Sequence, residues 1–137
     1  MLADAVQAAD GKLYILGGGW NVSGQAPFGI ALLLEVPWTE ANQGHRWELH
    51  LQTEDGEPVS FPETGAFEPI VVGGDFEVGR PAGVPAGTPF NVPVAINSGP
   101  MPLTPGRYTW RLLVDGETDE NWYLSFDVRD QQAPAGS

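Results

Sequence analysis

The segment from residue 105 to residue 129, PGRYTWRLLVDGETDENWYLSFDVR, decides the fold class. Apolar side chains occupy every second position on both sides of a polar stretch at residues 115–121. The members of the two apolar rows are Tyr108, Trp110, Leu112 and Val114, then Trp122, Leu124, Phe126 and Val128. Alternation of this kind is typical of strands buried on one face. Two such runs joined by a short polar loop predict an antiparallel hairpin.

The rest of the chain repeats short apolar runs separated by turn residues. Asp10-Gly11 between the runs at 4–9 and 12–17 predicts a two-residue hairpin turn, because both turn positions tolerate a positive φ. Residues 46–53 alternate like the segment above and predict another half-buried strand. Two shorter strands, which include Phe61 and Phe67, are expected between residues 60 and 78, and residues 79–89 are expected to form a loop.

Two further segments predict strands at different positions in a sheet, one central and one at an edge. Residues 30–36 are apolar apart from Glu35, which predicts a central strand covered at least in part on both faces. Residues 90–97 also predict a strand. Pro93 lacks a backbone donor and assigns that strand to a sheet edge, where it would limit the addition of a partner strand.

These segments predict an all-β protein, namely an immunoglobulin-like antiparallel β-sandwich of about 7–9 strands. Tyr108 follows a turn at the start of the penultimate strand, where such folds place a corner tyrosine that hydrogen-bonds back, here toward residues 101–105. A single domain is expected over residues 1–130. Residues 131–137 have no apolar pattern and predict a flexible tail.

Composition narrows the possible functions. The chain has 137 residues, no cysteine and a formal net charge of −12. Without cysteine, neither a disulfide nor a thiolate zinc site can form. The acidic balance argues against binding to nucleic acid or to anionic membranes, since both carry phosphate charges. No signal-peptide pattern is visible at the N-terminus, so the cytoplasm, or a particle assembled there, is the expected location.

Several short motifs resemble a small uncharacterised β-sandwich family of actinobacteria and their bacteriophages. They are Asp4-Ala5-Val6, residues 12–20, residues 32–35, residues 105–108 and residues 113–117. The resemblance spans residues 3–129, and the family offers no established activity or catalytic residues to carry over. The sequence predicts no cofactor. The resemblance implies a virion component or surface decoration as one setting for the protein.

The acidic loop after residue 114 is a candidate metal site. Asp115, Glu117 and Asp119 offer hard oxygen ligands at alternate positions, which can suit calcium. The order of ligands does not follow the EF-hand, and the alternative reading is a solvated acidic loop.

Aromatic residues outside the apolar rows are the candidate binding residues. Trp47, Trp110 and Trp122 fall on apolar faces and are expected in the core. Trp20 and Trp38 fall at strand ends or loops, and Tyr123 falls on the outer face of the last strand. Exposed aromatic side chains at such positions stack on sugars or anchor a protein interface.

Catalytic motifs are weak. His45 and His50 are the only histidines, and their odd spacing places them on opposite faces of one strand. No nucleophile elbow accompanies any serine. The sequence therefore predicts a non-enzymatic interaction or structural module that binds a protein partner or itself. A carbohydrate-binding module is the first alternative. A small hydrolase, which would need a histidine beside a carboxylate in a cleft, is the second.

Overall fold

The computed structural model describes residues 1–23, 26–60 and 69–129. The strands are β1 (Leu2–Ala3), β2 (Ala5–Ala9), β3 (Lys12–Leu16), β4 (Val22–Ser23), β5 (Phe28–Val36), β6 (Gly44–Thr53), β7 (Val71–Glu77), β8 (Phe90–Ser98), β9 (Gly106–Val114) and β10 (Tyr123–Val128). A short 3-10 helix, η1 (Trp38–Glu40), connects β5 to β6. The all-β prediction is confirmed. In the described part of the chain, no helix has the length and apolar content needed to cross a membrane.

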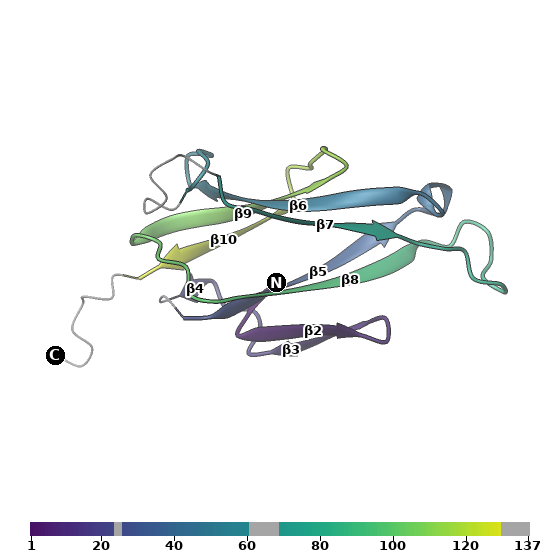
Figure 1. The fold of residues 1–137 in the computed structure, drawn as a ribbon, viewed down its shortest axis with the longest axis horizontal. Helices are drawn as coiled ribbons and strands as arrows, with labels where there is room; N and C mark the ends of the chain where they lie inside the picture. The colour runs from purple at the N-terminus through teal and green to yellow at the C-terminus, as the bar shows by residue number, and fades with distance from the viewer. Residues whose placement is uncertain (24–25, 61–68, 130–137) are drawn as a thin grey trace.

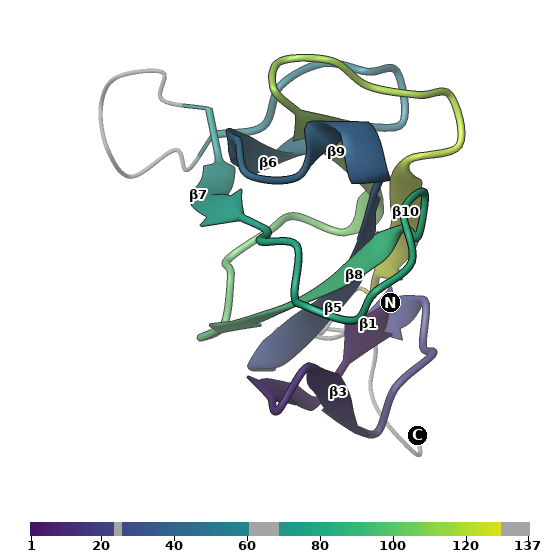
Figure 2. The same ribbon diagram turned by 90° about the vertical axis from the view of Figure 1, so that its right-hand side faces the viewer.

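The strands form two larger sheets and one separate hairpin. One sheet has the order β1-β5-β8, the second has the order β4-β10-β9-β6-β7, and β2 pairs only with β3. The pairings are antiparallel except that of β4 with β10, which is parallel. Figure 1 shows the two larger sheets facing each other, and Figure 2 shows the hairpin as a third layer on the outside of the β1-β5-β8 sheet.

The core lies between the two facing sheets because each contributes its apolar rows to the same space. The most enclosed side chains are Ile30 of β5, Leu49 and Leu51 of β6, and Trp110 of β9. Trp47 is also buried, so the core positions predicted for Trp47 and Trp110 are confirmed.

The hairpin of β2 and β3 turns at Asp10-Gly11, as predicted. Both residues have positive φ, 53° and 70°. Its inner side rests on small residues, since Ala3 and Ala31 are buried there with Val6. Short side chains let the hairpin approach closely enough for side-chain hydrogen bonds to its backbone.

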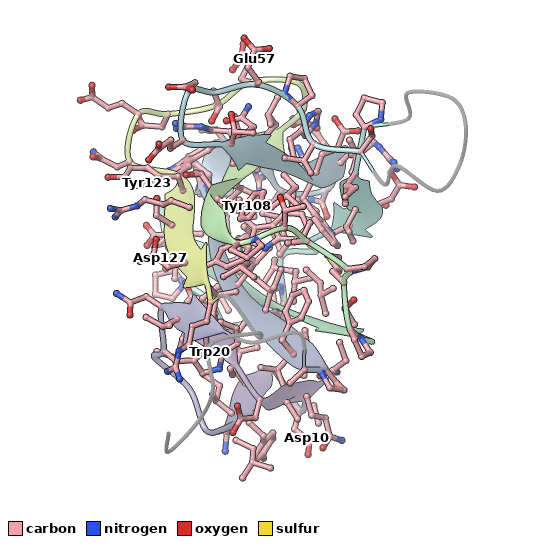
Figure 3. The ribbon with its side chains drawn as sticks, turned by 90° about the vertical axis from the view of Figure 1, so that its left-hand side faces the viewer. Asp10, Trp20, Glu57, Tyr108, Tyr123 and Asp127 are labelled. Carbon is pink, nitrogen blue, oxygen red and sulfur yellow. The ribbon has the colours of Figure 1, made fainter. Side chains whose placement is uncertain are left out.

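Tyr108 closes the corner that leads into β9. Its hydroxyl donates to the backbone oxygen of Thr104 over 2.7 Å, as the sequence predicted. Figure 3 shows Tyr108 between the facing sheets, while Tyr123 and Asp127 of β10 point outward.

Two predictions about strands need correction. Ten strands are present among the described residues rather than 7–9, because β1 and β4 have two residues each and are too short to show alternation. Trp122, expected in the core, is 41% exposed, because it precedes β10 and lies in the connection from β9. The central strand predicted at residues 30–36 is β5, and its cover is partial: the first half is covered on both faces, while Leu33 is 59% exposed and Glu35 is exposed as well.

Other predictions are confirmed, or they concern residues that the structure does not describe. β8, with Pro93, is an edge strand of its sheet. Residues 79–89 contain turns and no strand, as expected for a loop, and β8 begins directly after them. One of the two short strands expected between 60 and 78 is β7. The predictions for Phe61, for Phe67 and for the tail at 131–137 concern residues outside the described ranges.

Candidate functional site

The β1-β5-β8 sheet loses its edge strand part of the way along β5. β1 pairs with β5 only at Gly29 and Ile30, so the rest of that edge of β5 continues without it. On the opposite sheet, β10 begins at Tyr123, opposite Arg111, and β9 runs on to Val114, where it bonds to the β9–β10 connection instead. The space between β5 and β9 is therefore open at this side.

This opening forms a cleft of about 420 Å³, here called the inter-sheet cleft. Its walls are Leu34 and Val36 from β5, Leu112 and Val114 from β9, and Trp122. Leu33 alternates with Leu34 and lies at the rim, where it is exposed. Pro37, Glu40, His45 and Phe76 close one end, and Glu35 lies on the rim. The volume lies within the range of ligand-binding clefts, and the lining is mostly apolar with few polar groups, as such sites usually are.

The cleft continues along β5 toward the N-terminus. A neighbouring depression of about 210 Å³ shares Leu33, Leu112 and Trp122 with it and extends to Met1 and Tyr123. The two depressions thus make one groove that follows the uncovered edge of β5.

His45 is the buried polar side chain at the closed end of the cleft. Only 8% of the residue is exposed, and its ring stacks on Phe76 with 5.2 Å between ring centroids. Nε2 lies 2.8 Å from the backbone oxygen of Glu40, and Nδ1 lies 2.7 Å from Oδ2 of Asp115. A carbonyl oxygen only accepts, so Nε2 carries a proton and donates. The carboxylate likewise favours a proton on Nδ1.

His45 and Asp115 stabilise each other in their charged forms. The hydrogen bond to Asp115, aided by that to the Glu40 carbonyl, raises the pKa of His45 above its ordinary value of 6.5. In turn, the hydrogen bonds from His45 and from the Arg46 backbone N–H hold the pKa of Asp115 below 3.8. The pair joins η1, β6 and the β9–β10 connection and so fixes the closed end of the cleft.

Asp115 is positioned by a tight turn. Asp115 and Gly116 both have positive φ, 52° and 79°, and Val114 exchanges hydrogen bonds with Glu117 across them. Asp-Gly suits this turn type. Asp115 also caps β6 through a 2.9 Å hydrogen bond from the Arg46 backbone N–H.

The acidic loop is not arranged as a metal site. Asp115 is bound to His45 and Arg46, while Oδ1 of Asp119 accepts the backbone N–H of Asn121 within its own turn. Among residues 1–23, 26–60 and 69–129, no three His, Cys, Asp or Glu side chains gather in a group that could hold a metal ion. Asp115, Glu117 and Asp119 are therefore not brought together as ligands.

Trp20 and Trp38 do not form an exposed aromatic strip. The ring of Trp38 stacks on Phe90 at 5.7 Å, and the guanidinium of Arg80 lies over it at 4.4 Å. Trp20 is half-buried, packs edge-on against Phe28, and lies near the hairpin end of the molecule (Figure 3). Trp38 therefore has two neighbours on its ring, and Trp20 has part of its side chain packed against the core.

Tyr123 is the one candidate of the three that lies beside the groove. It is 50% exposed, on the outer face of β10 as predicted, with Arg111 5.3 Å from its ring. Trp122, which the sequence assigned to the core, lies next to it and lines the cleft itself. The alternation of apolar residues in the last strand extends back to Trp122, and for this reason the sequence predicted a buried side chain there.

His45 and Asp115 resemble two members of a hydrolytic triad, but the geometry does not support that chemistry. A general base needs its second ring nitrogen free to take a proton from a nucleophile. Here Nε2 is occupied by the Glu40 carbonyl, and no Ser, Thr or Cys is among the described residues that line the cleft. His50 lies on the other face of β6, half-exposed.

Comparison with known proteins adds the family. No curated protein and no solved structure matches the chain. The model of one family, described as a family of unknown function (DUF6941), matches residues 1–128. The chain therefore belongs to the DUF6941 family.

Proposed function

We propose that this protein is a non-catalytic interaction module that binds a protein partner in the inter-sheet cleft. The observation that carries the proposal is the coincidence of an apolar cleft with a strand edge that has no paired strand among residues 1–23, 26–60 and 69–129. Leu33, 59% exposed, and Trp122, 41% exposed, flank it. Large apolar side chains that gather around a concave surface mark interaction sites more often than scattered ones do.

The charge of the surface favours a basic partner. Glu35 and Glu40 are exposed at the cleft, and the chain carries a net charge of −12. Opposite charge on the partner would speed association and orient it, while nucleic acid would be repelled.

The proposal extends to the fold type and the setting. The order β4-β10-β9-β6-β7 opposite β5 and β8, together with the hydrogen bond from Tyr108 to Thr104, supports an immunoglobulin-like sandwich with an extra N-terminal hairpin. The resemblance to a family of actinobacteria and their bacteriophages makes a phage particle the first setting in which to seek the partner.

Photo-crosslinking from the rim of the cleft tests the proposal. A photoreactive amino acid replaces Leu33 in one variant and Val71, an exposed apolar residue at the end of edge strand β7, in a matched control. After irradiation in lysate of the native source, the proposal expects one discrete protein adduct from position 33 that is missing from position 71. Equal labelling from both positions, or none from position 33, would contradict it.

A further inference from the structure

Hydrogen bonding to β1 determines which groups of β5 face the uncovered edge. The amino group of Met1 donates to the Ala31 oxygen, and the Ala31 N–H donates to the Met1 oxygen, each over 2.8 Å. Backbone groups alternate along a strand, so those of Leu33 and Glu35 point to the same side as those of Ala31. For these two residues, the described part of the chain supplies no backbone partner on that side.

The same register determines where the side chains of an added strand would lie. Leu2 is opposite Ile30, and both are buried in the core between the sheets. Side chains alternate, so residues opposite Leu34 and Val36 would also point inward, into the cleft. A residue opposite Glu35 would lie beside that carboxylate on the outer face.

The other edge of this sheet is protected and the edge of β5 is not. Pro93 of β8 is opposite Leu33. Since the backbone groups of Leu33 face away from β8, those of Pro93 face the outer edge, where proline has no N–H to offer. Proteins commonly place proline on edges to prevent strand addition. In β5, by contrast, the uncovered edge presents both donors and acceptors.

From this geometry we infer that the cleft takes a β-strand of the partner protein, antiparallel to β5 and in line with β1. The inference rests on the proposed function. The added strand carries apolar side chains opposite Leu34 and Val36 and a lysine or arginine opposite Glu35, because oppositely charged cross-strand pairs are favourable. Strand addition of this kind derives affinity from the backbone and specificity from alternate side chains.

A second copy of the chain fits the edge less well. Antiparallel self-pairing over residues 32–36 would bring two molecules of net charge −12 together and place the Glu35 side chain of each near the joint. A dimer in solution whose Leu33 and Glu35 amides are slow to exchange would replace the proposed partner and overturn the inference.

An intramolecular strand tests the inference without the partner in hand. The extension Val-Lys-Val-Thr-Val, added directly before Met1, would lie opposite Val36, Glu35, Leu34, Leu33 and Leu32 in that order. Covalent linkage gives it a high effective concentration. We expect a higher melting temperature and at least about tenfold slower hydrogen exchange at the Leu33 and Glu35 amides, as for newly formed ladder bonds.

The matched control has the same composition in a different order. Lys-Val-Thr-Val-Val turns its lysine and threonine into the cleft and should leave both amides fast and the melting temperature unraised. Protected amides of Leu49 and Trp110 verify that each variant is folded. Unchanged exchange at Leu33 and Glu35 in the first variant, or equal slowing in both, would overturn the strand register.

Crosslinking separates failure of this inference from failure of the proposed function. The Val-Lys-Val-Thr-Val variant, with the photoreactive residue at position 33, should lose the adduct seen without the extension. If the amides slow and the adduct persists, the partner does not bind as this strand, although it still binds near the cleft. If the unextended protein gives no adduct, the proposed function itself fails.

Discussion

His45 shows how one buried side chain connects three segments at the cleft. It shares its face of β6 with Trp47 and Leu49, so its burial follows from the alternation in the sequence. Its partner Asp115 lies 70 positions away, and no local pattern pairs the two. Asp115 was a candidate metal ligand in the sequence because acidic residues cluster around it, and a solvated acidic loop was the other interpretation. The structure uses it as a hydrogen-bond acceptor.

Replacing His45 should destabilise the fold. His45→Leu keeps roughly the side-chain volume but removes both hydrogen bonds, for an expected loss of about 1–3 kcal/mol in the free energy of unfolding. Denaturant unfolding measures it. The control His50→Leu, on the half-exposed face, should stay within about 0.5 kcal/mol. Equal losses in the two variants would contradict the role given to the His45 pair.

The pair also predicts how stability depends on pH. The pKa of His45 is raised in the folded state, so its contribution to stability is complete below pH 6.5 and is lost as the pH rises through the raised pKa. The pKa of Asp115 is lowered in the folded state, so its contribution to stability is complete above pH 3.8 and is lost as the pH falls through the lowered pKa. The stability difference between wild type and His45→Leu should therefore be largest between these two values. Unfolding curves across pH check this, and a difference that grows toward alkaline pH would refute it.

Tyr108 gives a second test at this scale. Tyr108→Phe removes the hydrogen bond to the Thr104 oxygen and should cost about 0.5–1.5 kcal/mol of unfolding free energy with little change in structure. Thr104→Val, which removes the side-chain hydroxyl 3.0 Å from the tyrosine but keeps the carbonyl, should cost less. A smaller loss of unfolding free energy for Tyr108→Phe than for Thr104→Val would contradict the hydrogen bond from Tyr108 to the Thr104 carbonyl.

Among the elements, the N-terminal hairpin depends on one side chain of β8. Asn97 accepts the Val6 N–H over 3.0 Å and donates to the Val6 oxygen over 2.7 Å. No sequence pattern connects these residues, which lie 91 positions apart. This pair of hydrogen bonds, with the small alanines beneath, attaches the third layer.

Asn97→Ala should loosen the hairpin before the rest of the fold. We expect faster hydrogen exchange in β2 and β3, while β6 and β9 keep their protection, because local opening costs less than global unfolding. Asn91→Ala, at an exposed position of the same strand, is the control and should change neither. Uniformly faster exchange throughout the chain would show that the hairpin is not an independent layer.

Strands with clear alternation could be predicted from the sequence, and those that depend on distant partners could not. The hairpin of β9 and β10 and the turn at Asp10-Gly11 carry their own signals. The mostly apolar composition of residues 30–36 predicted cover on both faces at least in part, and only the first half of β5 has it. Whether a strand is covered depends on which segments pair with it, and β1 pairs with β5 only at Gly29 and Ile30. The cleft lies along the rest of that edge, and no local pattern in the sequence indicates such a pairing.

At the scale of the whole molecule, the protein has two facing sheets. In the β1-β5-β8 sheet, the edge at β8 is protected against strand addition and the edge at β5 is open. The β8 edge has Pro93, and the outer face of the β1-β5-β8 sheet has the hairpin. The edge of β5 beyond Ala31 has neither, and it borders an apolar cleft with acidic side chains around it. A protein that leaves such an edge open in an otherwise protected sheet has a site suited to a partner strand.

Hydrogen exchange of the free protein, measured residue by residue along β5, shows whether the edge of β5 is open. The amides of Leu32 and Leu34 bond to β8, while those of Leu33 and Glu35 face the open edge. We expect the amides of Leu32 and Leu34 to exchange at least about a hundredfold more slowly than those of Leu33 and Glu35. Equal protection at all four amides would mean that the edge is already covered and that no partner strand can be added there.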